Sequence, residues 1–402
     1  MNNPVPQLTV NLWGHLSGGF GLGEGARCTA RALTAAGVRV QWRDLPLATH
    51  VNDQPLAQAE PFQAAAIDLI HTNPNVLRQT DGIMQKIDLQ SPLRIGFWAW
   101  ELESFPIGWE AGFSGLDQLW CPSSFCASSL GLRSSIPVTP LPHLIDWDRA
   151  QRLRLLRSSS ASKANKIFNC LFAFDFWSTV GRKNPHGVID AFQLAFPMRR
   201  NWGSRTPEAR LVLKLSSSAQ FPDATEALQQ RAQADQRIKL ISDHLNNQEF
   251  DQLYREADVL VSLHRAEGFG LSLAEAMAAE LPVVATGYSG NLDFMPTGSA
   301  ELIPYKLTKI SKTEGDYRAG ELWAEPDLDA AAKAIRNLAE NAVYRKQLAK
   351  SGRKAVESNL NITKISNIVR ERLGCLIAKP GRAELVRQLP STHPWRTLDE
   401  LA

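Results

Sequence analysis

Short apolar runs alternate along the chain with longer segments in which apolar residues recur every three or four positions. Runs bounded by turn residues predict buried strands, and the longer period predicts amphipathic helices. In the first part of the chain the apolar runs are "LTVNLWG", "VRVQWRD", "AIDLIHTNP", "RIGFWAWE" and "DQLWCPSS", and "PVTPLPHLID" closes this region. The predicted helices are "ARCTARALTAAG", which ends on Gly37, and "SFCASSLGL", which Ser123 or Ser124 caps.

The same alternation restarts after residue 166. The predicted strands are "IFNCLFAF", "ARLVLKLS", "IKLIS", "VLVSLH", "PVVATG" and "AELIPY". The predicted helices between them are "PHGVIDAFQLAF", "ATEALQQRAQ", "QEFDQLYREA" and "LSLAEAMAAE", and two amphipathic helices follow in residues 327–358. Strands that alternate with helices predict parallel sheets with helices on both faces, so we expect two doubly wound α/β domains.

The boundary between these domains is marked by composition. The chain has 402 residues, which is too long for a single ordinary hydrophobic core, so two domains are expected. The segment "RAQRLRLLRSSSASKANK" is basic and then serine-rich, which is typical of a linker. We predict an N-terminal Rossmann-like domain in 1–150, a linker in 151–165, a C-terminal Rossmann-like domain in 166–385, and a tail in 386–402 that crosses back to the first domain. Ligands of such sheets bind beyond the carboxyl ends of the strands, so the expected site is the cleft between the domains.

Composition and charge exclude several functional classes. Hydrophobic residues make up 44% and charged residues 21%, and the formal net charge of +3 gives no case for nucleic acid as a partner. Five scattered cysteines favour a reducing compartment, and we interpret the closest pair, Cys121 and Cys126, as packing residues. The start of the chain does not resemble a signal peptide, and no apolar run approaches the roughly 20 residues of a membrane span. We expect a cytoplasmic protein, with peripheral membrane contact left open.

The first loop with candidate chemistry is "SGGFGLGEGAR", between the first strand and its helix. Glycines let the backbone approach a ligand, and a helix start offers free amides, which suits a diphosphate. The alternative is a turn that only packs strand against helix. The nucleoside triphosphatase pattern is absent, but Asp44 at the end of the second strand leaves an NAD-dependent dehydrogenase open.

The second loop is "FDFWSTVGRKNPHG", after the first strand of the second domain. Arg182 and Lys183 precede Pro185, which suits the first turn of a helix. Two cations there oppose the helix dipole unless an anion lies between, so the pattern favours a phosphate site over a solvated basic turn. Lys214, near the end of the strand "ARLVLKLS", is a further candidate cation or a structural lysine.

The third loop, "RAEGFGLSLAE", follows the predicted strand "VLVSLH" and opens a helix. Backbone amides of Phe269, Gly270 and Leu271 form the start of that helix and can face a phosphate. Glu267 lies on the loop and Glu275 in the helix, where carboxylates can accept hydrogen bonds from sugar hydroxyls. Two ordinary acids favoured by the helix dipole are the alternative.

The stretch "EGFGLSLAEAMAAELPVVAT" resembles the signature of family 4 retaining glycosyltransferases, in which two glutamates flank seven residues. "SLHRAEGFGL", "RKNP" and "GYSGNLDFM" are similar to bacterial members that build polysaccharides. The resemblance is strong over roughly residues 166–370 and moderate before them. It implies the GT-B fold, an α/β architecture of two Rossmann-like domains facing across a cleft, with acceptors bound by the first domain.

Several site residues follow from this resemblance. Glu275 is expected to bind the nucleotide ribose, and Glu267 to hold hydroxyls of the donor sugar. Lys183, with Arg182, is expected to neutralise the diphosphate, and Asp293 in the "SGNLDF" turn is a weaker candidate. Ser178 stands where many members have an arginine, so Arg182 is interpreted as its substitute.

The first domain departs further from the family. Gly21 and Gly23 match its glycine loop and are expected to let this domain close on the diphosphate. Many members carry a histidine after the fourth strand, where this chain has "FWAWELESFP". We therefore expect Trp98, Trp100 or Glu101 to shape the acceptor or sugar site.

The predicted function is retaining, metal-independent transfer of a sugar from a nucleoside diphosphate sugar to a glycan, lipid-linked or other hydroxyl acceptor, without a cofactor. The acid pattern "DLD" at Asp327–Asp329 is interpreted as a helix cap and not as a metal site. Three alternatives stay open: an NAD-dependent oxidoreductase, a catalytically silent GT-B partner of a working transferase, and a nucleotide-sugar epimerase of the same fold.

Overall fold

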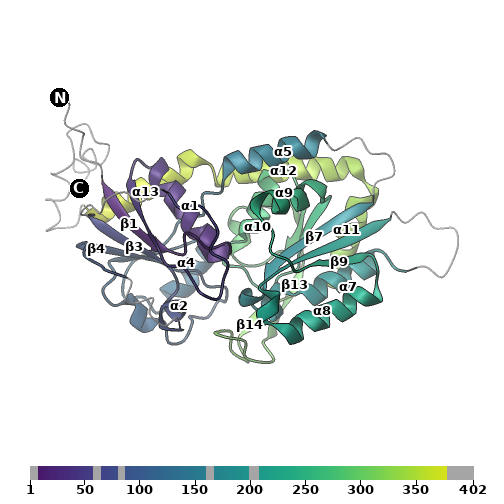
Figure 1. The fold of residues 1–402 in the computed structure, drawn as a ribbon, viewed down its shortest axis with the longest axis horizontal. Coiled ribbons are helices and arrows are strands. Elements are labelled where there is room, and N and C mark those ends of the chain that lie inside the picture. The colour runs from purple at the N-terminus through teal and green to yellow at the C-terminus, as the bar shows by residue number, and fades with distance from the viewer. Residues whose placement is uncertain (1–7, 58–64, 80–86, 160–166, 199–207, 378–402) are drawn as a thin grey trace. The chain divides into compact units, whose positions relative to one another are not determined.

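Two parallel sheets organise the chain into two compact units (Figure 1). The computed structural model describes residues 8–57, 65–79, 87–159, 167–198 and 208–377. Unit 1 comprises the described residues up to Leu144 together with those from Leu360 onward, and unit 2 comprises Ile145–Asn359. The predicted class of two doubly wound α/β units is confirmed.

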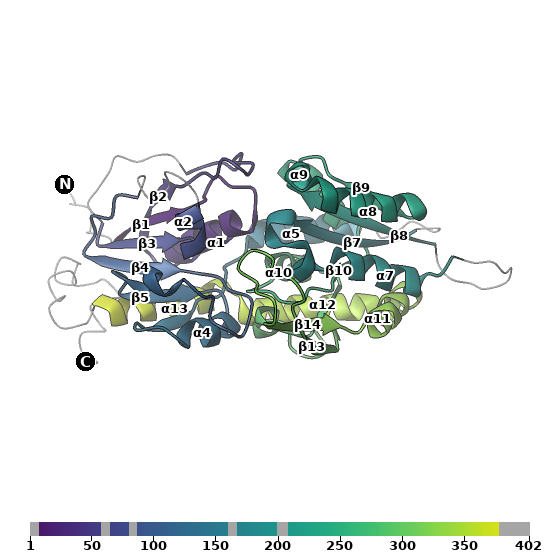
Figure 2. The same cartoon turned by 90° about the horizontal axis from the view of Figure 1, so that it is seen from below.

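The sheet of unit 1 has six strands in the order β2-β1-β3-β4-β5-β6, and all neighbouring strands are parallel. Figure 2 shows β2, β1, β3, β4 and β5 side by side in this order. The strands are β1 Thr9–Gly14, β2 Arg39–Asp44, β3 Ile67–His71, β4 Leu93–Phe97, β5 Gln118–Cys121 and β6 Val138–Pro140. The helices are α1 Gly21–Ala35, α2 Pro74–Gln79, the 3-10 turn η1 Glu110–Phe113, α4 Ser124–Gly131 and α13 Ile362–Ile377.

The last described helix, α13, belongs to unit 1 and packs on α1. Arg370 donates from Nε to the carbonyl of Ala36 (3.2 Å) and from Nη2 to that of Ala35 (3.1 Å), which satisfies carbonyls at the end of α1. The predicted second domain, residues 166–385, is therefore too long, because the described residues from Leu360 onward belong to unit 1. The predicted tail, residues 386–402, lies outside the described residues.

The sheet of unit 2 also has six parallel strands, in the order β12-β11-β10-β7-β8-β9. The strands are β7 Phe168–Asp175, β8 Ala209–Ser216, β9 Ile238–Ile241, β10 Val259–Ser262, β11 Val283–Thr286 and β12 Glu301–Ile303. The crossover helices are α7 Pro185–Ala195, α8 Pro222–Ala234, α9 Asn247–Glu256 and α10 Leu271–Ala278, and α11 Leu328–Glu340 and α12 Ala342–Asn359 follow the last strand of the unit. Helices α7 and α8 cover one face of the sheet, and α9 and α10 cover the other (Figure 1).

Two segments of unit 2 differ from the sequence prediction. The described part of the expected linker is a helix, α5 Trp147–Ser159, because its arginines find partners in unit 2: Arg154 pairs with Glu280 (3.4 Å), and Arg157 donates to the carbonyl of Ala257 (2.7 Å). Beyond β12 the chain forms an antiparallel hairpin of β13 Tyr305–Lys309 and β14 Leu322–Pro326, which the pattern did not predict. Asp327 then caps α11, as expected, by accepting a bond from the backbone of Ala330 (2.9 Å).

Candidate functional site

Three loops of unit 2 meet at the carboxyl ends of β7, β10 and β11, where β10 lies between the other two strands. The loop after β7 contains the 3-10 turn η2 Phe176–Ser178 and the short helix α6 Val180–Lys183. The loop after β10 carries the "RAEGFG" turn, and the loop after β11 contains η4 Gly290–Asp293. Because these three parallel strands are neighbours, the loops that follow them lie close together, and so do the charged residues on the loops.

The centre of this arrangement is an ion cluster that the sequence predicted as separate candidates. The ammonium of Lys183 contacts Oε1 of Glu267, and Nη1 of Arg182 lies 3.6 Å from Oε2 of the same carboxylate. Arg182 is the more enclosed cation, and it also donates to the carbonyls of Ser178 (3.2 Å) and Ala266 (3.0 Å). Lys183 is therefore the cation better placed to exchange its partner for a ligand.

Glu267 is ionised in this environment. Its carboxyl is buried, which opposes ionisation, but Lys183 and Arg182 outweigh that effect and lower the pKa of Glu267 to about 2. An ionised carboxylate is acceptor-only. At neutral pH Glu267 can accept hydrogen bonds from hydroxyl groups, but it has no proton to donate as a general acid.

A set of uncharged residues holds the cluster in place, and the sequence analysis did not single them out. Asn184, in a left-handed conformation (φ 55°), caps α7 through the backbone of Gly187 (3.1 Å) and donates to the carbonyl of Leu263 (2.9 Å). The backbone N–H of Glu267 donates to the hydroxyl of Ser289 (2.8 Å). The sequence feature that could have indicated these residues is the pair of polar segments "RKN" and "GYSGN" in the loops after β7 and β11.

The helix start after the glycine turn has the predicted form. Gly270, with φ 90°, is the N-cap of α10, and no side chain caps the first turn. A Cβ on this glycine would lie 2.9 Å from Cδ1 of Leu273, so both conformation and space require glycine. Phe269 is buried against Phe294 (ring centroids 4.9 Å apart), which leaves the backbone around Leu271, and not the phenyl ring, as the candidate ligand contact.

Glu275 lies on α10 and has a partner from α5. Its Oε1 accepts a bond from Nη1 of Arg149 (3.1 Å), and the same guanidinium pairs with Asp251 (2.8 Å) and lies 5.7 Å from the ring centre of Tyr254. Burial acts against the charge of Arg149, but Glu275 and the other acids raise its pKa. The ion pair fixes the direction of the predicted ribose-binding carboxylate.

Two weaker candidates have different surroundings. Lys214 lies on β8 and donates to the carbonyl of Leu215 (2.8 Å) and to the hydroxyl of Ser216 (3.3 Å), so its ammonium caps its own strand end. Burial lowers the pKa of Lys214. Asp293 is half-buried at the end of η4.

In unit 1 the glycine loop is held by hydrogen bonds from Arg27 to backbone carbonyls in and next to the loop. Arg27 donates from Nη1 to the carbonyls of Leu16 and Gly18, each at 2.8 Å. A Cβ on Gly23 would lie 2.3 Å from the carbonyl oxygen of Gly18, whereas nothing lies within 4 Å of one on Gly21. Gly23 is thus needed for packing, and only Gly21 leaves open space for the predicted close approach.

The tryptophan segment after β4 is mostly core. Trp100 was predicted to shape the acceptor or sugar site, but its side chain is buried and its Nε1 donates to the carbonyl of Ser104 (2.6 Å). Trp98 is also buried, with its ring 4.9 Å from that of Phe113. Glu101 is half-buried, and of the three predicted residues Trp98, Trp100 and Glu101 it is the one that keeps access to solvent.

Three histidines at the strand ends of unit 1 were not expected. His15 lies 3.0 Å from Thr72, and His71 lies 3.1 Å from Thr29 and stacks on Phe97 at 4.1 Å. Burial lowers the pKa of each histidine of the set His15, His71 and His143, in His143 to about 3. These side chains are neutral at physiological pH.

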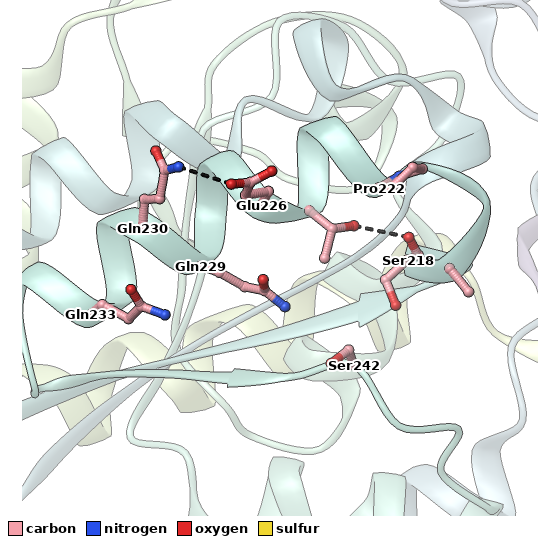
Figure 3. Close-up of a pocket in the computed structure, with 9 residues that line it drawn as sticks. Ser218, Pro222, Glu226, Gln229, Gln230, Gln233 and Ser242 are labelled. Atoms are coloured by element: carbon pink, nitrogen blue, oxygen red, sulfur yellow. Dashed lines mark hydrogen bonds between the residues drawn. The ribbon is translucent and has the colours of Figure 1, made fainter.

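A surface groove of about 650 Å³ lies elsewhere on unit 2, along α8 and the ends of β8 and β9 (Figure 3). Its lining is polar and mostly uncharged: Ser218, Ala219, Pro222, Thr225, Glu226, Gln229, Gln230, Gln233 and Ser242. None of the ion-cluster residues lines this groove. It has no paired charges, and it is separate from the ion cluster.

Residues 179–355 match the family model "Glycosyl transferases group 1". Over 172 residues the chain is 27% identical to the lipopolysaccharide core biosynthesis mannosyltransferase LpsB of Rhizobium meliloti (strain 1021). That match covers 41% of this chain and 45% of the relative, so it spans less than half of either protein.

Solved structures show a similar fold over more than nine tenths of the chain. A glycosyltransferase from Rickettsia africae matches with a TM-score of 0.60 and 12% identity over 94% of this chain and 100% of that one. The Anabaena protein Alr3699/HepE, solved in complex with UDP and glucose, matches with a TM-score of 0.60 and 14% identity over 92% of this chain and 100% of that one. Residues 179–355 are therefore similar to the glycosyl transferases group 1 family, in a chain that has the GT-B fold.

Proposed function

We propose that the chain is a retaining glycosyltransferase that moves a sugar from a nucleoside diphosphate sugar to a hydroxyl of a glycan or lipid-linked acceptor. The observation that carries this proposal is the cluster of Lys183 and Arg182 on Glu267, beside the uncapped start of α10. The cluster has one more positive than negative charge, and the positive end of the α10 dipole adds to the attraction for a diphosphate.

The ion pair suggests how the donor enters. When a diphosphate binds, the ammonium of Lys183 turns from Glu267 toward the phosphate oxygens. The freed carboxylate then accepts bonds from hydroxyls of the donor sugar. Lys183 stabilises the charge that develops on the leaving diphosphate, and a leaving phosphate oxygen can take the proton of the attacking hydroxyl. Positioning and electrostatics thus supply the catalysis.

A panel of nucleotide sugars tests the proposal. The full chain should release free nucleoside diphosphate from at least one donor, slowly in water and faster with a suitable hydroxyl acceptor. If no donor is turned over but a nucleoside diphosphate binds, the silent GT-B partner replaces the transferase. A changed sugar in the absence of acceptor would indicate an epimerase.

The acceptor class is proposed from the relative. The LpsB match is named for lipopolysaccharide core synthesis, which makes a membrane-anchored glycan acceptor the first to test.

No helix in the described residues is long and apolar enough to cross a membrane. We expect peripheral contact with anionic lipid instead, through α5 and α12, whose exposed residues include Arg152, Leu155, Leu156, Lys346, Lys350 and Lys354. Co-sedimentation with anionic but not neutral vesicles, lost in the variant Lys350→Glu/Lys354→Glu, would support this contact, and equal binding to both vesicles would contradict it.

A further inference from the structure

We propose that the β13–β14 hairpin is a positioning element of the donor site, with Arg265, Glu325 and Tyr317 as positioning residues. The inference rests on the proposed function, because it assigns the hairpin the task of holding the diphosphate-binding helix α6 against Glu267. The three residues act through Arg182 and Lys183 and do not themselves touch the donor.

Arg265 connects three segments of unit 2. Its guanidinium forms a two-point ion pair with Glu325 of β14 (2.6 and 3.0 Å) and lies 5.1 Å from the ring centre of Trp323. The remaining nitrogen, Nη1, donates to the carbonyl of Gly181 in α6 (2.6 Å). Paired nitrogen–carboxylate bonds fix the plane of a guanidinium, so the position of α6 is tied to the hairpin.

The backbone of Arg265 repeats the same connection. Its N–H donates to the carbonyl of Arg182 (2.7 Å), and its carbonyl accepts from the N–H of Ala324 (2.9 Å). Arg265 directly precedes the "AEG" turn that carries Glu267. The two halves of the ion cluster, the cations on α6 and the carboxylate after β10, are therefore joined to each other and to β14 through one residue.

The connecting segment of the hairpin covers α6 from another direction. The carboxylate of Glu314 accepts a bond from the N–H of Gly181 (3.2 Å), and the ring centre of Tyr317 lies 5.7 Å from the guanidinium carbon of Arg182. Glu314 and Tyr317 are themselves linked by reciprocal backbone bonds (2.9 and 3.1 Å). A Cβ on Gly181 would lie 2.7 Å from Glu314 and 2.8 Å from Trp323, so the fit is close.

Helix α6 needs such support because it is only four residues long. A single turn does not form by itself in water, and the flanking Thr179 and Asn184 both have positive φ (61° and 55°). Without the hairpin, the cations of α6 would sample orientations away from Glu267 and from a bound diphosphate. Preorganisation of these charges is the gain that the hairpin provides.

The test compares ligands that differ only in their phosphates. UDP, GDP and ADP are screened against the full chain, and the nucleoside of the best binder is measured by competition. In Arg265→Met we expect the diphosphate to bind about tenfold more weakly while the nucleoside is unchanged; in Tyr317→Leu, at the less buried hairpin end, we expect about threefold. Arg265→Lys should recover part of the loss.

Arg336→Met is the matched control, because Arg336 donates to the carbonyls of Ala195 and Leu194 on α7 and has no contact with the cluster. Unchanged diphosphate affinity in both Arg265→Met and Tyr317→Leu overturns the inference, as does an equal loss for diphosphate and nucleoside. If the unaltered chain binds none of the three diphosphates, the proposed function itself fails, which is a separate result.

Discussion

The carboxyl ends of the two sheets have opposite chemistry. In unit 2 they carry Arg182, Lys183 and an ionised Glu267 within direct contact. In unit 1 they carry the neutral rings of His71 and His143, packed against Phe97. Both sheets have six parallel strands, so the architecture does not decide which unit binds an anion.

The difference assigns different parts of a substrate to the two units. Neutral, buried rings cannot neutralise a diphosphate, so we infer that unit 2 supplies the charge contacts. Unit 1 is then suited to uncharged polyol or apolar groups, and Glu101 is its half-buried acid near the strand ends. Each prediction below changes one side of this contrast.

The largest effect is expected from Glu267→Gln, which keeps the shape of the carboxylate but removes its charge. We expect turnover of the best donor to fall by about 10²-fold, as for the loss of one preorganised contact. Donor hydrolysis and transfer rates measure this effect. Thermal unfolding is a check on folding, because the buried Arg182 and the half-buried Lys183 lose their counter-charge. Glu340→Gln, an exposed acid at the end of α11, is the control. Turnover near that of the unaltered chain would remove Glu267 from the site.

Two lysines of unit 2 are expected to differ in their contribution to diphosphate binding. Lys183→Met should weaken nucleoside diphosphate binding by about 10- to 100-fold, the range for a hydrogen bond to a charged group. Lys214→Met should leave it within about twofold, because the ammonium of Lys214 already serves carbonyl and hydroxyl groups of its own strand end. Calorimetric titration of both variants decides between them. Equal losses would mean that both lysines reach the diphosphate.

The sequence predicted the strands of both sheets and the glutamate and lysine positions, because apolar periodicity and loop chemistry are local. It did not predict that Glu267 and Lys183 pair with each other, since they are far apart in sequence and meet only when β7 and β10 become neighbours. The segment that became α5 is rich in arginine and serine, and its helix depends on partners such as Glu280 and the carbonyl of Ala257. The β13–β14 hairpin was missed because the strand predictions followed buried apolar runs, whereas the side chains of β13, Tyr305 and Leu307 included, are exposed or half-buried.

Acid should lower the stability of unit 1 more than that of unit 2 between pH 6.5 and 5, because burial lowers the pKa of three histidines in unit 1, His15, His71 and His143, and of two in unit 2, His186 and His264. Burial holds the pKa of His143 at about 3 when folded, against 6.5 for an exposed histidine, so the unfolded chain binds more protons between these values. Stability is therefore full above pH 6.5 and falls as the pH drops toward 3, by about 2 kcal/mol at pH 5 from this residue. Glu267, with a pKa of about 2 against 4.5, loses its contribution only between pH 4.5 and 2.

Hydrogen exchange resolved by peptide tests this order. Between pH 7 and 5, after correction for the intrinsic rate, strands β1, β3 and β4 should lose more protection than β7 and β10. His143→Gln should reduce the pH dependence in unit 1. An equal loss of protection in both units would remove this distinction between them.

The smallest effect separates packing from binding in the glycine loop of unit 1. Gly23→Ala should lower the free energy of unfolding by about 1–3 kcal/mol, because its Cβ would meet the carbonyl oxygens of Gly18 and His15 at 2.3 and 2.6 Å. Gly21→Ala should change stability by less than about 0.5 kcal/mol, since nothing lies within 4 Å of its Cβ. Gly21→Ala therefore reports on ligand contact alone. A raised KM for the donor at unchanged stability would mean that the backbone of unit 1 also approaches the diphosphate. The contrast between charged and neutral strand ends would then hold for the side chains of the two units but not for their backbones. An unchanged KM would leave the diphosphate to unit 2.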